Sequence, residues 1–361
     1  MKRTRGRGVR IETLADFDRR LARGARRLSG WRLHGVDLTA RSEQLASCHL
    51  SGATFLGCSF AAGDRARVEA AGGLVLPAIG DVPVDVYRSR LYAAHELYDT
   101  ASYAASLDAR AYAWSQHGQD QDDTLAQALH DHAIDQALEA WVHGRRLVGV
   151  MGGHALTRDQ PAYADAARLG AGLGVHHVVA TGGGPGAMEA ANLGASLAGR
   201  DAGDLDAALA LLAPVPSYHP SADAWVSSAR AVLARFPRVV ESLSIPTWHY
   251  GHEPANLFAT AIAKYFRNST REAILLEVCD AGIVFLPGAG GTVQEVFQDA
   301  CENYYADESS VAPMVLVGRS HWTETLPAWP LLRALAHGRP MEPHVHLVDT
   351  VEEAVALVDA G

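Results

Sequence analysis

The sequence predicts an α/β protein whose main domain is a Rossmann-like, doubly wound parallel sheet with helices on both faces. Two observations lead to this fold class. From residue 146 onward, short apolar segments of strand length alternate with helical segments, a succession that is typical of a parallel sheet. Two glycine-rich turns, at 182–186 and 287–291, each follow an apolar strand and open a helix. A helical and pentapeptide-like N-terminal extension precedes this domain.

The chain is acidic as a whole but basic at its beginning. Its 361 residues carry a formal net charge of −10, whereas residues 1–32 contain eleven Lys and Arg against three acidic residues. An acidic body argues against nucleic acid as a partner. The basic N-terminal segment is most simply a terminus that is solvated or docked on the acidic remainder of the chain, and contact with nucleic acid or with a polyphosphate effector stays open.

Hydropathy gives no sign of a membrane protein or a secreted one. No apolar run approaches the roughly 20 residues of a membrane helix, and the basic N-terminus lacks the apolar stretch of a secretory signal. The four cysteines form no CxxC pair and are expected to be reduced thiols. We therefore expect a cytoplasmic protein without a membrane partner.

The first 145 residues divide into two segments. Residues 1–82 are predicted to form a basic arm and a pentapeptide-like extension, because bulky apolar residues recur every five positions at Leu45, Leu50, Phe55 and Phe60. Residues 83–145 are predicted to be helical, with a long helix over about 123–142. Neither segment carries a motif for chemistry, and the helical one is expected to form a layer or an oligomer contact.

Residues 146–361 form the predicted nucleotide-binding domain. Apolar runs predict strands, and amphipathic or glycine-initiated runs predict helices between them. The expected strands are 147–151, 175–180, 208–215, 239–243, 282–286 and 314–317, and the expected helices are 163–173, 188–198 and a third from the second glycine turn to about 305. Ligands of such sheets bind beyond the carboxyl ends of the strands, where Gly152 and both glycine turns must lie.

The turn at 287–291 indicates an anion site with an acid beside it. Glycines let the backbone approach a ligand, and a helix start offers unpaired N–H groups to an anion. We expect Gly288, Gly290, Gly291 and Thr292 to bind a phosphate. Glu295 lies one helical turn further on, beside the anion rather than on it. A phosphate cradle next to a carboxylate favours chemistry on a phosphorylated sugar.

The first glycine turn predicts a second clamp on the same ligand. Gly182, Gly183, Gly184 and Gly186 are expected to approach a phosphate or ribose, and Glu189 to accept a hydrogen bond from a sugar hydroxyl. This turn also fits the G-x-G-x-x-A dinucleotide fingerprint, which leaves an NAD-dependent oxidoreductase open. That interpretation requires an acidic residue at the end of the following strand, and the segment 214–216, which ends the predicted strand 208–215, contains none.

No metal site is predicted, despite seventeen histidines. His176 and His177 lie in a predicted strand, where neighbouring side chains point to opposite faces and cannot bind one ion. Neither an HExxH pattern nor a zinc spacing of cysteines is present. We expect no cofactor.

The two glycine turns together resemble the signatures of the LONELY GUY (LOG) family, the cytokinin-activating phosphoribohydrolases long misnamed lysine decarboxylases, and the related nucleotide 5′-monophosphate nucleosidases. The first signature ends in MEAA, as do residues 182–191 here. The second, PGGxGTxxE, is matched at Pro287, Gly288, Gly291, Thr292 and Glu295, and departs from the family at Ala289. A methyl group there would crowd the anion if the residue required positive φ. Gly290 is the candidate for the flexible role.

The resemblance implies further site residues, an activity and partners. Arg271 matches the position of the family's catalytic arginine, although Glu272 follows it where the family has lysine. The implied reaction is hydrolysis of the N-glycosidic bond of a nucleoside 5′-monophosphate to free base and ribose 5-phosphate, with Arg271 and Glu295 catalytic and no metal or redox cofactor. A homo-oligomer is implied as well. The open alternative is a non-catalytic carrier of a nucleotide or of the molybdenum cofactor.

Overall fold

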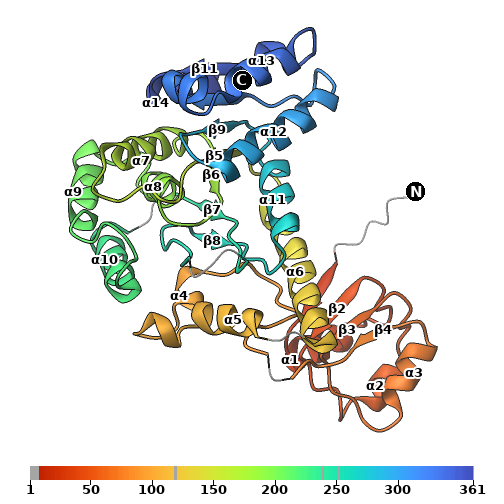
Figure 1. Ribbon diagram of the computed structural model, residues 1–361. Helices are drawn as coiled ribbons and strands as arrows, with labels where there is room; N and C mark the ends of the chain where they lie inside the picture. Colours follow the sequence, from red (N-terminus) through yellow and green to blue (C-terminus); the bar gives the residue numbers. More distant parts are fainter. Residues whose placement is uncertain (1–7, 81, 118–119, 238–239, 250–252, 361) are drawn as a thin grey trace. The chain divides into compact units, whose positions relative to one another are not determined.

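The protein consists of two compact units. The computed structural model describes residues 8–80, 82–117, 120–237, 240–249 and 253–360, so the first seven residues of the predicted basic arm lie outside it. The first unit spans Met1–Tyr87 and the second spans Arg88–Gly361. Figure 1 traces the chain through both, and each unit is described by itself.

The first unit is a small parallel sheet whose strands alternate with helices. Its strands pair in the order β1-β2-β3-β4. They are β1 (Val9–Ile11), β2 (Trp31–His34), β3 (Thr54–Leu56) and β4 (Leu74–Leu76), and the helices between them are α1 (Leu14–Ala22), α2 (Ser42–Ala46) and α3 (Asp64–Ala70). Ile11, Leu33, Phe55 and Val75 are aligned across the four strands and are buried in one apolar core.

The expected pentapeptide-like coil is wrong. The unit repeats a strand and a helix, and Leu33 pairs in register with Phe55, twenty-two positions later. Leu45, Leu50 and Phe55 reach the same core, but they reach it from α2, from a turn and from β3. The five-residue spacing arises because three different local structures direct side chains inward, which a linear pattern does not distinguish.

The second unit contains a seven-stranded, fully parallel sheet, which confirms the predicted fold class. The strand order is β11-β10-β9-β5-β6-β7-β8. The bounds are β5 (Leu147–Met151), β6 (Val178–Thr181), β7 (Ser242–Ser244), β8 (Ala261–Ile262), β9 (Ile283–Phe285), β10 (Met314–Val317) and β11 (Val345–Val348). The first strand of the sheet, β5, is central, and the order reverses between β5 and β9, as in doubly wound dinucleotide-binding folds.

Helices flank this sheet on both faces (Figure 1). The helices that precede the sheet are α4 (Ala94–Leu97), α5 (Leu107–Gln116) and α6 (Gln121–Val142). The later ones are α7 (Pro161–Leu173), α8 (Ala187–Ser196), α9 (Ala202–Leu212), α10 (Ala222–Arg235), α11 (Asn268–Glu277), α12 (Gly290–Tyr305), α13 (Ala328–Ala336) and α14 (Val351–Asp359). None of the helices in the described ranges is both long and apolar enough to cross a membrane.

Close packing of α7 against α8 sets the position of the first glycine turn. A Cβ at Gly170 would collide with the backbone of Ala191, and one at Gly194 with the backbone of Ala167. The absence of both side chains lets the two helix backbones touch, as small residues do at tight helix interfaces. Because α8 begins where the turn at 182–186 ends, this contact fixes the turn relative to the sheet.

The predicted strand at 208–215 is wrong. That segment belongs to α9 and the turn after it. Its run of Ala and Leu is apolar enough for a buried strand, but these residues are also strong helix formers, and a short apolar run does not decide between the two. Of the strand expected at 239–243, the sheet contains Ser242–Ser244, and residue 239 lies outside the described ranges. β8 and β11 were not predicted.

Candidate functional site

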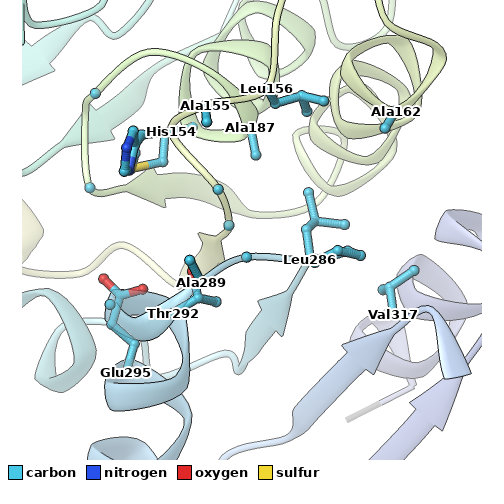
Figure 2. A pocket seen from close by; sticks show the side chains of 18 of the residues that line it. His154, Ala155, Leu156, Ala162, Ala187, Leu286, Ala289, Thr292, Glu295 and Val317 are labelled. Atoms are coloured by element: carbon cyan, nitrogen blue, oxygen red, sulfur yellow. The ribbon is translucent and has the colours of Figure 1, made fainter. Parts of the chain in front are cut away.

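One large cavity lies at the carboxyl ends of the central strands of the second unit. It has a volume of 990 Å³ and is lined by the segments that follow β5, β6, β7, β9, β10 and β11. Among its lining residues are Gly152, Gly182, Gly184, Gly288, Gly291, Thr292, Arg271 and Glu295. These eight predicted site residues come from three strand ends and two helices. Figure 2 shows Glu295 at one end of the cavity and Val317 at the other.

The first glycine turn is held by a buried network of amides and a hydroxyl. The N–H of Gly183 donates to Oγ1 of Thr181 (3.0 Å), and the N–H of Asn256 donates to the carbonyl of Gly183 (2.8 Å). The Thr181 hydroxyl and Nδ2 of Asn256 both donate to Oδ1 of Asn192. Gly183 has φ +76°, a conformation that L side chains rarely adopt. The conformation of the turn is therefore fixed by hydrogen bonds within the protein.

Gly182 is required by the arginine that lies against it. A Cβ at Gly182 would overlap the guanidinium of Arg271. Nε of Arg271 donates to the carbonyl of Ile245 (2.6 Å), the residue that follows β7. The side chain thus extends from α11 across the ends of β7 and β6, and only 7% of the residue is exposed.

Arg271 and Glu295 form an ion pair in the cavity wall. Nη1 of Arg271 lies 3.6 Å from Oε1 of Glu295, and their side chains are 9% and 14% exposed. Burial raises the pKa of Glu295. The positive charge of Arg271 acts against this rise, and the negative charge of Glu272 adds to it. Glu295 is therefore an acid that titrates above the ordinary range of a glutamate, next to a fixed cation.

The second glycine turn presents the start of α12 to the cavity. The first backbone hydrogen bond of this helix runs from the N–H of Val293 to the carbonyl of Ala289, so the N–H groups before Val293 have no acceptor within the helix. Ala289 has φ −115°, and its methyl group is accommodated without strain. A Cβ at Gly291 would meet nothing within 4 Å, so this residue faces open space.

Four predicted site residues do not line the cavity. Gly183, Gly186 and Gly290 belong to the two turns but only shape them; Gly186, with φ +77°, packs against the backbone of Gly153. Glu189 is also buried away from the cavity. Its carboxylate accepts from Nε of Arg158 (3.1 Å), and both side chains are 1% exposed.

The Arg158–Glu189 ion pair joins α8 to the segment that follows β5. Nη1 of Arg158 also donates to Oγ of Ser228 in α10 (2.7 Å). The structure therefore gives Glu189 a structural partner in place of the predicted sugar hydroxyl. A buried acid at the first turn of a helix and a ligand-binding acid look alike in the sequence.

Several cavity residues were not predicted. Met188, Glu253 and Glu272 line the cavity, and His154, which lies after β5, is 3.9 Å from Glu253. The adjacency of Glu272 to Arg271 was a usable signal. Glu253 carries no local pattern, since it reaches the cavity from the long connection between β7 and β8. No cluster of His, Cys, Asp and Glu suited to a metal ion occurs within the described residues.

A second buried acid lies one turn beyond Glu295 on α12. Asp299 is 6% exposed, and burial, reinforced by the charge of Glu302, raises its pKa to about 8. Its Oδ2 atom is buried without a hydrogen-bond partner. A carboxyl group in this environment favours its neutral form.

Comparisons with known proteins yield similarity to solved structures alone. A scan against protein-family models finds no match, and a search of curated proteins finds no significant match. The molybdenum cofactor binding protein from the phototrophic bacterium Rippkaea orientalis aligns with a TM-score of 0.36 and 16% identity, over 60% of this chain and 96% of that one.

Two structures of the molybdenum cofactor carrier protein from Chlamydomonas reinhardtii give a similar result. Both align with a TM-score of 0.37, at 18% and 19% identity, over 60% of this chain and 97% and 96% of theirs. Similarity at this level says nothing about what the present chain binds or does. The functional argument therefore depends on the cavity itself.

Proposed function

We propose that the second unit hydrolyses the N-glycosidic bond of nucleoside 5′-monophosphates and releases the free base and ribose 5-phosphate. The observation that carries the proposal is the convergence of Arg271 and Glu295 on the cavity that also contains the start of α12. The anion site suits the phosphate of a phosphorylated sugar. The neighbouring cation and acid suit its ring, on which positive charge develops when the N-glycosidic bond breaks.

The start of α12 is the proposed phosphate site. The N–H groups of Gly291 and Thr292, both of which line the cavity, and the partial positive charge of the helix terminus favour an anion there. Gly291 leaves open space above it. With the 5′-phosphate at this point, the ribose extends along the first turns of α12 toward Glu295.

Glu295 is the proposed catalytic group. Cleavage of the bond from C1′ to the base nitrogen builds positive charge on the ribose ring, and an ionised carboxylate beside the ring stabilises that charge and orients the attacking water. Water adds its hydroxyl to C1′, and the base leaves with a proton on its nitrogen. Arg271 orients the sugar and keeps Glu295 available in its ionised form.

A product assay tests this proposal. The full chain is incubated with AMP, CMP and GMP, and free base and ribose 5-phosphate are measured. We expect release of base, and a loss of turnover of about a hundredfold or more in Glu295→Gln with nucleotide affinity retained. Activity of the variant within a few fold of the unmodified protein removes Glu295 from the catalytic role.

The same assay separates the enzyme from a carrier. A carrier needs the glycine turns but not an acid beside the sugar, so a nucleotide that stays bound and unchanged over hours favours the carrier. Protection against heat by NAD(H) is the corresponding sign of an oxidoreductase.

Association into a homo-oligomer stays a prediction, which light scattering of the full chain checks.

A further inference from the structure

The cavity continues well beyond the catalytic pair. We call the part farthest from Glu295 the distal half. Its walls are formed by apolar residues: Leu156, Ala162, Leu286, Val317 and Val351. Three carboxylates line it as well: Asp165, Asp349 and Glu352. Figure 2 shows Leu156, Ala162 and Val317 on the opposite side of Leu286 and Ala289 from Glu295. The total volume of 990 Å³ is at the upper end of the roughly 300–1,000 Å³ that is usual for small-molecule sites.

The strand order indicates how far apart the two ends of the cavity lie. Arg271 lies over the ends of β6 and β7, whereas Val317 ends β10 and Asp349 follows β11. Three inter-strand spacings separate β6 from β10, a distance of about 14 Å. The central turns after β5 and β9 touch each other, since the N–H of Gly153 donates to the carbonyl of Pro287 (3.3 Å). The phosphate site is therefore central, with one half of the cavity on each side.

We propose that the cavity accommodates a ligand with two nucleoside arms joined through phosphates, that is, a dinucleotide. One arm places its ribose beside Glu295, the phosphates lie at the central turns, and the second nucleoside occupies the distal half. This inference rests on the proposed function for the position of the first arm. A doubly wound sheet binds a dinucleotide across the point where its strand order reverses, which is here between β5 and β9.

The chemistry of the distal half suits a neutral nucleoside. Apolar walls accept the faces of a base, and carboxylates accept hydrogen bonds from ribose hydroxyls and exocyclic amino groups. Asp349 accepts from the N–H of Arg319 (3.0 Å), and Asp165 pairs with Arg168 at the surface. Glu352 lies in the first turn of α14. Arg168 and Arg319 offset the charges of Asp165 and Asp349, so Glu352 is the acid that disfavours a terminal phosphate at this end of the cavity.

The bond that breaks is the same one in this larger ligand. Water adds its hydroxyl to C1′ of the ribose beside Glu295, the N-glycosidic bond breaks, and the base leaves protonated on nitrogen. The distal nucleoside and both phosphates remain on the product. No further reactant is required.

Three adenine ligands with the same scissile bond test the proposal: AMP, ADP and diadenosine 5′,5′-diphosphate. Their affinities are measured by calorimetry and their adenine release by chromatography. We expect the full chain to bind the dinucleotide about tenfold or more tightly than either AMP or ADP, because only the dinucleotide carries a second nucleoside. Equal affinities for AMP and the dinucleotide overturn the two-armed ligand, even if adenine is released from both.

Ala162→Trp fills the distal half. Ala162 is exposed in the first turn of α7, so a larger side chain there disturbs no buried packing. We expect the affinity ratio of dinucleotide to AMP to fall to about one. Leu331→Trp, at an exposed position of α13 that lines no described cavity, is the matched control and should keep the ratio of the unmodified protein. A ratio unchanged by Ala162→Trp contradicts the proposal.

Glu352→Lys provides a second variant, in which ligand affinity should rise rather than fall. A cation in the distal half should attract a terminal phosphate and raise the affinity for ADP relative to AMP by about tenfold. An ADP affinity that does not move places Glu352 outside the ligand's reach and counts against the proposal. Retained dinucleotide preference without release of adenine from any ligand supports the two-armed site while removing the hydrolase function.

Discussion

Nη1 of Arg271 and Oε1 of Glu295 lie 3.6 Å apart, although the two residues belong to different helices, α11 and α12. The pair is nearly buried, and its cation also packs against Gly182 and binds the carbonyl of Ile245. A charge held by three elements has little freedom to reorganise, which is the property that an electrostatic catalyst requires. The predictions below follow from this pair and from the helix that carries Glu295.

The acid limb of the pH–activity profile should report the pKa of Glu295. Because burial and the charge of Glu272 raise this pKa, turnover should fall with decreasing pH at a value above the ordinary range of a glutamate. Glu272→Gln removes a neighbouring negative charge and so lowers the pKa of Glu295. Glu295 then stays ionised to lower pH, and the acid limb of the profile shifts to lower pH. The turnover number, measured from pH 4 to 9 for both proteins, checks this. An unmoved limb assigns the titration to another group.

Gly182→Ala should displace Arg271 while leaving the fold intact. The added methyl group overlaps the guanidinium of Arg271 and the Sδ atom of Met188, which are side-chain ends rather than backbone, so we expect a loss of stability of about 1–2 kcal/mol. The guanidinium must move away from its place beside the sugar, and kcat/KM should fall by roughly 10- to 100-fold, as for misplaced catalytic groups. Thermal unfolding and single-turnover assays measure the two effects. Full activity would show that the position of Arg271 is not critical.

Gly291→Glu should lower the affinity for nucleotide without lowering the stability of the protein. The new side chain points into open space, and an acid at the start of a helix is favourable to stability. The same charge repels a phosphate, so affinity should fall by about tenfold or more. Gly203→Glu is the matched control, because Gly203 is also the second residue of its helix, α9, and also faces open space. Similar affinities for the two variants would place the phosphate elsewhere.

Asp299→Asn should stabilise the protein increasingly as pH rises. The folded-state pKa of about 8 exceeds the ordinary value, so the proton on Asp299 contributes stability below pH 4 that is lost between about pH 4 and 8. The difference in unfolding free energy between the variant and the unmodified protein should grow over that range by at most about 1.4 kcal/mol per pH unit. Urea unfolding at several pH values measures it, with the exposed Glu308→Gln as the control for loss of one charge. A constant difference would show that Asp299 titrates normally.

Local sequence was sufficient where backbone chemistry alone decides the outcome. The glycine turns at 182–186 and 287–291 lie between a strand and a helix, as predicted, because glycine tolerates the required conformations and leaves N–H groups accessible. The alternation of strands and helices after residue 146 likewise indicates a parallel sheet. The prediction from local sequence was wrong at 208–215, where an Ala- and Leu-rich run satisfies the burial requirements of both a strand and a helix.

Sequence by itself therefore determined the fold class and the two turns that line the cavity. The tertiary structure alone decided which acids face the ligand: Glu295 lines the cavity, whereas Glu189 is buried against Arg158. Both are glutamates near the start of a helix after a glycine turn, so no local pattern separates them. It also decided that the cavity extends across the sheet to Val317. The physical reason is that burial, ion pairing and cavity shape depend on which distant segments the chain brings together, and spacing along a single chain does not contain that information.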